Sequence, residues 1–408
     1  MVAVLIGVGL LSLLIWLGVL LHPARPWDFQ PVGDDEPFPP SLAPWPAVCI
    51  LVPARNERDS LPETLPSLLT QEYPGEFAVV VVDDRSQDGT AEIARAIAKK
   101  CGTEERLAVI TGAPLPPGWV GKVWALEQGA SFCGVGGREP SQLKISKPEY
   151  LLLTDADIRH APDSLRRLVA ESQGERLALN SRMARLRCVS GPERLLIPPF
   201  VFFFNLLYPM RQVNNPRHAM AGAAGGCVLL QTAALERAGG FSCIKNCIID
   251  DVSLARQIKR VDAPIRLALS RREVESRRAY DSLHTIWVMV RRTAFTELQY
   301  SWVRLLGTLV GMALMFVVPP LWTIGGVGIL LAEWGSPITE TSLLVCASLI
   351  GLAAWTIMAL VYRPAVRFFQ LSPMWCWLLP VAGVLYEGMT LDSAMRYVTG
   401  KHIGWRDQ

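Results

Sequence analysis

The sequence predicts an α/β domain built on a parallel sheet, joined to a membrane by apolar helices before and after it. Three observations lead to this class. Apolar runs alternate with helical stretches between residues 47 and 157, as in a sheet whose strands are buried on both faces. An uncharged stretch begins at residue 2, and three apolar runs follow residue 305. Half of the 408 residues are hydrophobic and only 19% are charged, whereas soluble domains carry about 25% charge.

Composition excludes several other classes. The hydrophobic content is too high for a disordered or fibrous chain. The net charge of +3 is too small to indicate a nucleic-acid partner. The nine cysteines show no Cys-x-x-Cys spacing, and the five histidines are too few to favour a zinc site. We therefore expect unpaired thiols, in a reducing cytosolic domain and in lipid-buried helices.

The uncharged residues 2–21 predict a membrane anchor, since twenty helical residues span about 30 Å, the thickness of the hydrocarbon core. No basic residue precedes them and no clear cleavage site follows, so we expect an uncleaved transmembrane segment rather than a signal peptide. Arg25 and Arg55 follow the anchor, which places the next domain in the cytoplasm by the positive-inside rule. A proline-rich linker comes in between.

Strands and helices of the α/β domain follow from the alternation of apolar runs with amphipathic stretches. Because each strand is separated from the next by a helical stretch, the strands are expected to pair in parallel. The expected strands are residues 47–54, 77–84, 106–110 and 150–157, and the expected helices are 58–72, 90–100 and 121–132.

Three apolar runs near the C-terminus predict membrane helices, at residues 305–331, 341–362 and 373–391. The loop between the first two carries only acidic charge and the next loop only basic charge, which places the former outside and the latter inside. The third run, which contains Glu387, is expected to be re-entrant or interfacial, because a further span would put a basic tail outside. The predicted parts are an anchor (1–22), a linker (23–46), the α/β domain (47–270), interfacial helices (271–304), membrane helices (305–391) and a cytoplasmic tail (392–408).

Two further stretches indicate contact with a membrane surface. Residues 193–211 are very apolar and are interrupted by prolines, and residues 282–304 mix tryptophan and tyrosine with arginine. Aromatic and arginine side chains together suit the boundary between lipid and water. The alternative is that both stretches are core helices of the α/β domain.

Acidic residues follow one strand after another, at the edge where open α/β sheets bind their ligands. Pro53, Arg55 and Glu57 close the first strand, in the sequence VPARNE. Asp83 and Asp84 end the second strand, and either carboxylate can accept a hydrogen bond from a nucleobase or a ribose. The dipole of the following helix would explain Glu57 without a function. A cap of the next helix would explain Asp88 in the same way, but it does not explain two carboxylates at a buried strand end.

Asp155 and Asp157 follow the strand at 150–157, in the sequence TDAD. If that segment is extended, both side chains lie on the same side and can meet one Mg²⁺ or Mn²⁺ together with a diphosphate. An Asp-x-Asp pair alone is a weak pattern, but it is stronger behind a second strand that ends in two aspartates.

Asp250 and Asp251 begin a further predicted helix, which has Leu254 on its apolar face. The helix dipole favours one acid there, and a second carboxylate that faces a cleft is a candidate general base. Lys122, at the start of the helix expected at 121–132, is a candidate contact for a diphosphate. The glycines of AGGCVLL and RAGGF permit either a close backbone approach or simple turns.

In this order the motifs VPARNE, VVDDRSQDGT, GKVWAL, TDAD, AGGCVLL and DDVSLARQIKR resemble glycosyltransferase family 2, over roughly residues 47–260. The anchor, RLLIPPFVFFFNLLYP and the RRTAF segment extend the resemblance over nearly the whole chain, to the hopene-associated glycosyltransferases of bacteria. The resemblance implies a GT-A fold, which is Rossmann-like, with a nucleotide-sugar donor and Mg²⁺ or Mn²⁺. It also implies a multi-pass protein of the bacterial inner membrane whose catalytic domain faces the cytoplasm.

The resemblance further implies a role for each motif residue. One base together with one metal implies direct displacement with inversion at the anomeric carbon. The implied donor-binding residues are Pro53, Arg55, Glu57, Asp83 or Asp84, Lys122 at the diphosphate, and Asp155. The implied metal ligands are Asp157, as the main one, and Asp155. The implied catalytic residues are Asp251, as the base that deprotonates the acceptor hydroxyl, and its neighbour Asp250.

Two departures from the family pattern bear on the acceptor. Asp250 stands where the family often has glutamate, and it keeps the charge. Residues 291–295 (RRTAF) stand near the place of the Gln-x-x-Arg-Trp motif of processive members. We therefore expect transfer of one sugar to a membrane lipid, with a polyterpenoid alcohol of the hopanoid class first. The alternatives are a polyprenyl phosphate, a carotenoid or a ceramide-like acceptor, and a non-catalytic membrane scaffold with the same fold.

Overall fold

The computed structural model describes residues 2–29, 31, 44–136, 145–332 and 338–400. The chain divides into two compact units. The sheet unit consists of Gln30–Arg187 and Met210–Ala279, and the helical unit of Met1–Phe29, Cys188–Pro209 and Tyr280–Ile403. Part of the predicted linker (32–43) and part of the predicted tail (401–408) lie outside the described residues.

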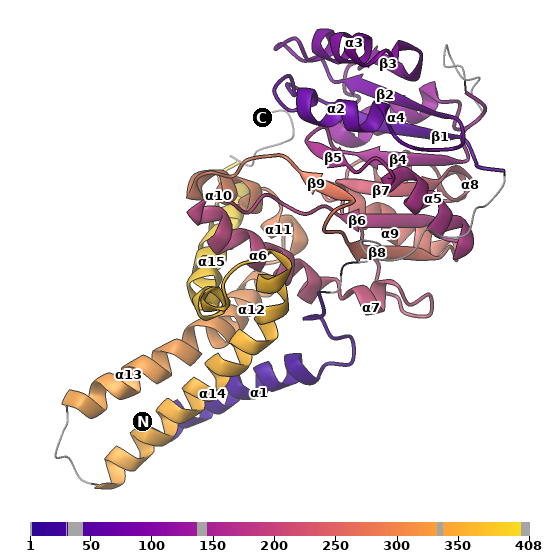
Figure 1. Cartoon of the computed structure of the whole chain (residues 1–408). Helices are drawn as coiled ribbons and strands as arrows, with labels where there is room; N and C mark the ends of the chain where they lie inside the picture. Colours follow the sequence, from indigo (N-terminus) through magenta and orange to yellow (C-terminus); the bar gives the residue numbers. More distant parts are fainter. Residues whose placement is uncertain (1, 30, 32–43, 137–144, 333–337, 401–408) are drawn as a thin grey trace. The chain divides into compact units, whose positions relative to one another are not determined.

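A seven-stranded mixed sheet forms the centre of the sheet unit (Figure 1). Its strands, in spatial order, are β3 (Leu107–Thr111), β2 (Phe77–Asp83), β1 (Val48–Ala54), β4 (Tyr150–Thr154), β7 (Cys227–Gln231), β6 (Leu179–Met183) and β8 (Ile265–Leu269). The four strands expected from the sequence are present and pair in parallel. β7 runs antiparallel to both of its neighbours, so the purely parallel sheet is corrected to a mixed one. The apolar sequence of a buried strand carries no sign of its direction.

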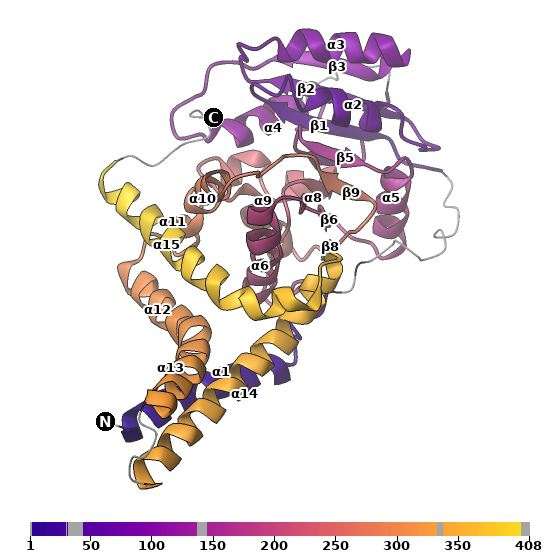
Figure 2. The same cartoon turned by 60° about the vertical axis from the view of Figure 1, so that its left-hand side comes forward.

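Helices cover both faces of this sheet (Figures 1 and 2). On one face, α2 (Leu61–Leu69), α3 (Thr90–Cys101) and α5 (Ser164–Gly174) share a core with alternate residues of β1 and β2. On the other face, a Cβ atom at Gly129 of α4 (Gly121–Phe132) would lie 3.1 Å from side-chain atoms of both Leu51 and Val82. The glycine therefore lets α4 pack closely on the sheet. The remaining elements of the sheet unit are η1 (Glu104–Arg106), α7 (Met210–Val213), α8 (Thr232–Arg237), η2 (Phe241–Ile244), α9 (Asp250–Arg260) and the strand pair β5 (Ile158–His160) and β9 (Val274–Ser276).

A disulfide joins Cys49 of β1 to Cys133, directly after α4, with the two Cα atoms 6.8 Å apart. Both residues are buried. The expectation of unpaired thiols is therefore wrong for this pair, although the other seven cysteines, all within the described residues, form no disulfide. The two partners are 84 residues apart and meet only through the packing of α4 on the sheet, which residue spacing does not reveal.

The helical unit contains three helices that are long and apolar enough to cross a membrane, among the residues that the structure describes: Trp302–Gly328, Ser342–Phe368 and Pro373–Val398. The third contains Glu387 and is longer than the predicted run, and its spanning or re-entrant course stays a prediction. A shorter apolar helix covers Ile6–Leu21. The elements of this unit are α1 (Val2–Leu21), α6 (Gly191–Leu207), α10 (Leu283–Arg291), α11 (Ala294–Glu297), α12 (Trp302–Met312), a π-helical turn (Ala313–Val317), α13 (Val318–Ala332), α14 (Ile338–Phe368), η4 (Pro373–Leu378) and α15 (Leu379–Val398).

The two stretches that were expected at a membrane surface lie mostly in the helical unit. α6 continues through its two internal prolines, and Ser190 and Glu193 close its N-terminus in a capping box. α10 packs against α6 and α15 through buried Leu196, Ile286 and Tyr386. Neither α6 nor α10 is thus a core helix of the sheet unit, and their contact with lipid stays a prediction.

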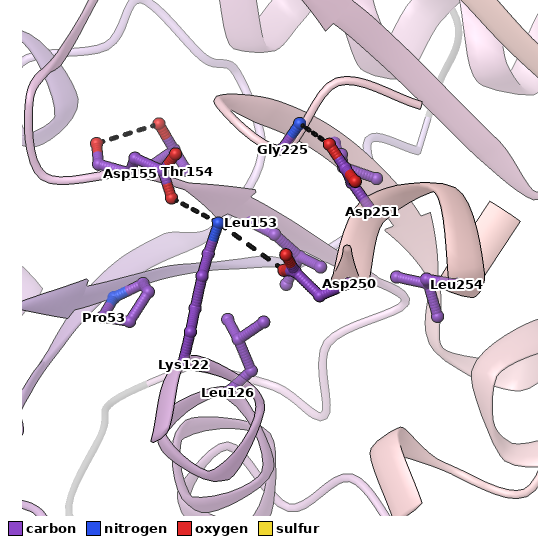
Figure 3. A pocket seen from close by; sticks show the side chains of 11 residues that line it. Pro53, Lys122, Leu126, Leu153, Thr154, Asp155, Gly225, Asp250, Asp251 and Leu254 are labelled. Carbon is purple, nitrogen blue, oxygen red and sulfur yellow. Dashed lines mark hydrogen bonds and ion pairs between the residues drawn. The ribbon is translucent and has the colours of Figure 1, made fainter. Parts of the chain in front are cut away.

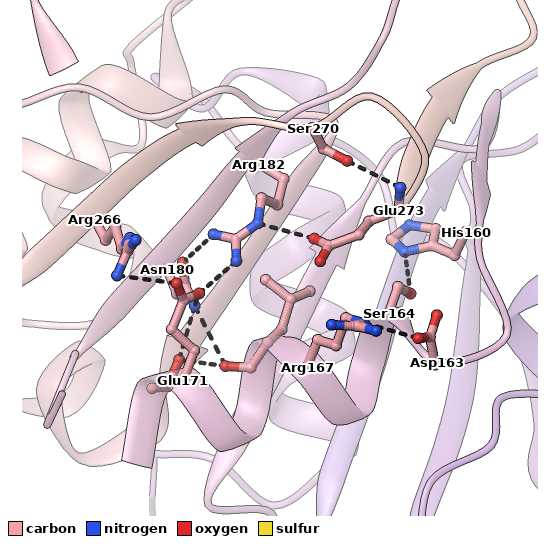
Figure 4. A network of polar contacts seen from close by, with 12 residues as sticks. His160, Asp163, Ser164, Arg167, Glu171, Asn180, Arg182, Arg266, Ser270 and Glu273 are labelled. Atoms are coloured by element: carbon pink, nitrogen blue, oxygen red, sulfur yellow. Dashed lines mark hydrogen bonds and ion pairs between the residues drawn. The ribbon is translucent and has the colours of Figure 1, made fainter. Parts of the chain in front are cut away.

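A buried ion network holds α5, β6 and the segment before β9 together (Figure 4). Arg182 is 1% exposed. Its Nε lies 3.0 Å from Glu273 Oε2, and its two other nitrogens donate to Asn180 and Glu171. Because a buried charge is stable only beside a partner, Arg182 fixes Glu273 in place. Glu273 directly precedes β9, so the network also fixes the course of the chain into that strand.

Replacing Arg182 by methionine leaves the Glu273 carboxylate buried without its guanidinium, and it leaves Glu171 with Arg266 as its remaining ion-pair partner. We expect Arg182→Met to cost about 3–5 kcal/mol of unfolding free energy, measured as a fall in Tm of the detergent-solubilised protein. Arg277→Gln is the control, because its ion pair with Glu63 is exposed and worth about 1 kcal/mol at most. An equal Tm for both variants would contradict this role of the network.

Candidate active site

The polar residues that the sequence singled out gather at one edge of the sheet, because β1, β2 and β4 are parallel neighbours and end side by side. Eleven residues line a cavity of about 10 Å³ at this edge (Figure 3). They include five of the predicted site residues, namely Pro53, Lys122, Asp155, Asp250 and Asp251. The others are Leu126, Leu153, Thr154, Gly225, Val228 and Leu254.

The ammonium group of Lys122 lies between two carboxylates (Figure 3). Its Nζ is 2.7 Å from Asp155 Oδ1 and 3.5 Å from Asp250 Oδ2. Burial by itself lowers the pKa of a lysine, but the charges of Asp155 and Asp250 outweigh this and raise the pKa of Lys122. The lysine therefore stays charged, although it sits in the first turn of α4, where the helix dipole favours anions.

Asp251 is held by backbone amides instead. Its Oδ2 accepts a hydrogen bond from the Gly225 amide and its Oδ1 from the Val252 amide, each at 2.7 Å. Burial and the charge of Asp250 raise the pKa of Asp251 to about 7, against the opposite effect of Lys122 and the two amides. A carboxyl group with this pKa is partly ionised at neutral pH and can take up a proton, as a general base must.

Gly225 makes this arrangement sterically feasible. A Cβ atom at this position would lie 3.2 Å from Lys122 Nζ and 3.3 Å from Asp251 Oδ2. Of the two possibilities that the sequence left open for the AGGCVLL glycines, Gly225 thus makes the close backbone approach. The residues that follow it continue as strand β7.

Asp155 and Asp157 do not lie on an extended segment, so the expectation that they share one side of a strand is wrong. β4 ends at Thr154 and the chain then turns, with the Ile158 amide donating to the Asp155 carbonyl at 3.2 Å. Asp155 binds Lys122, whereas Asp157 binds an arginine. They remain electrostatically close: burial raises the pKa of Asp157 most, and the charge of Asp155 raises it further, against the lowering effect of the arginine.

That arginine, Arg278, is the site residue that the sequence analysis missed. Its Nε lies 2.7 Å from Asp157 Oδ2, and its Nη2 lies 2.7 Å from Glu57 Oε1. It stands two residues after β9, beyond the predicted end of the domain at residue 270. The only signal was the adjacent pair Arg277-Arg278, and the chain has other adjacent arginine pairs, such as Arg291-Arg292.

The residues that follow β1 and β2 form separate contacts. Arg55 Nη1 lies 3.1 Å from Asp84 Oδ2. Asp83 is 7% exposed and accepts a hydrogen bond from the Ser86 amide, 3.0 Å away within its own turn. Glu57 accepts a hydrogen bond from Ser60 Oγ at 2.7 Å and another from Arg278, and burial raises the pKa of Glu57. The role of either aspartate at a nucleoside stays a prediction.

Asp155 and Asp157 suit a hard divalent cation, because both carboxylates belong to one turn and their charges disfavour each other. In the part of the chain that the structure describes, no three His, Cys, Asp or Glu side chains form a metal-binding group. The remaining ligands would therefore be phosphate oxygens and water, as is usual for Mg²⁺ in proteins.

Comparison with known proteins agrees with this geometry. Residues 49–239 match the family model described as glycosyl transferase family 2. The match covers just under half of the chain and makes this part similar to a glycosyltransferase family 2 domain. Its mixed α/β sheet, with charged side chains at the ends of the parallel strands, is the GT-A fold that the resemblance implied.

The chain is similar to two curated proteins and to one solved structure. The glucomannan 4-beta-mannosyltransferase 2 of Arabidopsis thaliana is 24% identical over 62% of this chain and 46% of its own length. The beta-monoglucosyldiacylglycerol synthase of Trichormus variabilis is 26% identical over 51% of this chain and 40% of its own. The chain thus spans less than half the length of these curated relatives. The structure of the mannosyltransferase PcManGT from Pyrobaculum calidifontis with GDP-Man and Mn²⁺ aligns over 98% of this chain and 97% of that chain, with 17% identity and a TM-score of 0.49.

The position of Lys122 between acidic residues predicts a pH-dependent loss of stability in Lys122→Met. The raised pKa of Asp251 means that its proton favours the folded state at low pH, and that this contribution is lost as the pH rises through about 7. Lys122 lowers the pKa of Asp251, so in its absence more stability is lost as the pH rises. The carboxylates of Asp155 and Asp250 also lack their cation in this variant. We expect a cost of about 3 kcal/mol at pH 8 and a much smaller one at pH 5, read from Tm.

The control is Lys147→Met, because Lys147 is exposed and its nitrogen lies 3.6 Å from Glu236, away from the site. It should change Tm little at either pH. If Lys122→Met lowered Tm equally at pH 5 and pH 8, the lysine would be holding the fold by packing rather than by charge.

Proposed function

We propose that the protein is an inverting, metal-dependent glycosyltransferase that moves one sugar from a nucleotide-sugar donor to a lipid in the membrane. The observation that carries the proposal is the constellation around Lys122 within a family 2 domain. Asp251, whose carboxyl group has a pKa raised to about 7, lies on one side of Lys122, and Asp155 lies on the other side. The first group suits an acceptor hydroxyl and the second suits a diphosphate with its cation.

Asp251 is the base in this proposal. The amides of Gly225 and Val252 hold its carboxylate in one orientation. Burial makes it a stronger base than an ordinary aspartate, so it can take the proton of the acceptor hydroxyl at neutral pH while the oxygen attacks the anomeric carbon. Asp250 contributes by raising that pKa and by holding Lys122. With one such base and direct attack, the configuration at the anomeric carbon inverts.

Lys122 stabilises the leaving diphosphate. Its charge persists at all working pH values because Asp155 and Asp250 raise its pKa, so a positive group stands ready where negative charge develops. Asp155 and Asp157 are the residues that would hold Mg²⁺ or Mn²⁺, which supplies further charge neutralisation to the diphosphate when bound. Pro53, Arg55, Glu57 and Asp83 or Asp84, on the neighbouring strand ends, bind the nucleoside.

A membrane lipid is the acceptor that the rest of the chain favours. Among the described residues, three apolar helices long enough to span a bilayer accompany the catalytic unit, and one relative is named for the glucosyldiacylglycerol that it makes. The whole-chain resemblance favours a polyterpenoid alcohol of the hopanoid class first, ahead of a polyprenyl phosphate, a carotenoid or a ceramide-like lipid. The charge pattern of the loops supports a multi-pass protein of the bacterial inner membrane with its catalytic unit in the cytoplasm.

Removal of the base should abolish transfer and spare donor binding. Asp251→Asn is expected to lower kcat at least about 100-fold, with the dissociation constant of the nucleotide nearly unchanged. In the wild type, kcat should fall as the pH is lowered through about 7, because protonated Asp251 accepts no proton. Normal turnover by Asp251→Asn, or a wild-type rate that is flat down to pH 5, would refute the assignment of the base.

Transfer itself is tested by following labelled sugar into organic-extractable lipid. The purified protein is supplied with lipid extract, Mn²⁺ or Mg²⁺ and a panel of nucleotide sugars, with Asp157→Ala as the blank. We expect label in one lipid band with one donor, and chemical analysis of that band separates hopanoid, polyprenyl phosphate, carotenoid and ceramide acceptors. Absence of label with every donor and every lipid class, from protein that binds nucleotide, would favour the membrane scaffold.

A further inference from the structure

Arg278 joins two acidic residues that come from different strand ends. Its guanidinium donates from Nε to Asp157 and from Nη2 to Glu57, both at 2.7 Å, so one side chain spans the metal-ligand candidate and a donor-site residue. Two-point contacts of this kind exploit the planar fork of arginine, which a lysine cannot reproduce. Removing the guanidinium therefore changes the surroundings of both carboxylates together.

The backbone brings Arg278 to this place. β9 pairs antiparallel with β5, which begins directly after Asp157. The amide of Arg277 then donates to the Asp157 carbonyl at 2.8 Å. The Arg278 backbone is thus tied to the turn that carries Asp155 and Asp157. Its side chain is 37% exposed, so the guanidinium can leave its partners without unpacking a core.

The charges at this turn are shared unevenly. Lys122 neutralises Asp155, and Arg278 neutralises Asp157 while also serving Glu57. The Asp157 side chain is 12% exposed and its Oδ2 accepts the guanidinium N–H. A divalent cation shared by Asp155 and Asp157 would need carboxylate oxygens of the same pair, and two cations on one carboxylate repel each other.

We propose that Arg278 is a displaceable counter-ion of the donor site. It neutralises Asp157 and Glu57 while the site holds no donor, it competes with the divalent cation for Asp157, and once displaced it pairs with the diphosphate that arrives with that cation. The inference rests on the proposed function, because it takes Asp157 as a metal ligand. It adds a reason for the cation and the nucleotide to bind together: the cation alone must displace Arg278 without giving it a new anion, whereas the nucleotide supplies one.

The test measures binding of Mn²⁺ rather than turnover. Full-length protein in detergent is stripped with EDTA, and free Mn²⁺ is counted by electron paramagnetic resonance, first with Mn²⁺ alone and then with UDP or GDP present. We expect Arg278→Gln to bind Mn²⁺ alone about tenfold more tightly than the wild type, since a charge-assisted hydrogen bond to Asp157 no longer competes. The nucleotide should strengthen Mn²⁺ binding in the wild type and much less so in Arg278→Gln.

Two further variants frame this result. Arg278→Lys keeps the charge without the two-point contact and should give an intermediate Mn²⁺ affinity. Arg277→Gln is the matched control: it lies next in sequence, but its side chain pairs with Glu63 on the surface, so it should leave both measurements unchanged. A gain in affinity cannot come from damage to the fold, because a misfolded site binds Mn²⁺ more weakly.

Unchanged or weaker Mn²⁺ binding by Arg278→Gln would overturn the inference, and weaker binding would assign Arg278 a purely supporting role for Asp157. If such a protein still moved sugar into lipid in a Mn²⁺-dependent way, the proposed function would stand and only the inference would fall. If the wild type bound no Mn²⁺ with or without nucleotide, the proposed metal dependence would be wrong as well. Transfer of sugar to lipid measured in EDTA would then show whether the proposed glycosyltransferase function stands without the metal.

Discussion

The structure of the site depends on balancing the negative charge of buried and partly buried carboxylates with few positive groups. A carboxylate removed from water is stable only beside a partner, and here each central cation serves two carboxylates. Lys122 lies between Asp155 and Asp250, and Arg278 lies between Asp157 and Glu57. The carboxylates therefore outnumber these cations. Charge repulsion within this group adds to burial, and both raise the pKa of Asp251 to about 7, against the charge of Lys122 and the two amides that hold the carboxylate.

The sheet makes this concentration of charge possible. β1, β2 and β4 are parallel neighbours, so the residues that follow them converge although they are far apart in sequence. The antiparallel β7 enters from the opposite direction, and the glycine that precedes it therefore reaches the same edge, where its amide holds Asp251. The buried Arg182 network then fixes the chain before β9 and so supports the approach of Arg278 from a third direction.

What could be predicted from the sequence is what depends on local patterns. Apolar runs located β1 to β4. The end of β4 located Asp155 and the start of α9 located Asp251, because strand ends and helix starts leave a local mark in the sequence. Contacts that arise only when distant segments pack together leave no such mark in the sequence. The direction of β7, the pairing of Cys49 with Cys133 and the position of Arg278 all require residues from distant segments to meet, and nothing near them in sequence indicates the partner.

The turn after β4 shows why motif spacing alone misleads about geometry. Two aspartates with one residue between them lie on the same side of a strand only if the strand continues through both of them. β4 ends at Thr154, directly before Asp155. The turn instead sends Asp155 to Lys122 and Asp157 to Arg278. The lysine in turn contacts Asp250, whose charge raises the pKa of Asp251, while Lys122 itself lowers that pKa. The aspartates that we propose for the donor and the candidate base that we propose for the acceptor are therefore linked through one ammonium group, so a charge change at one alters the electrostatic surroundings of the other.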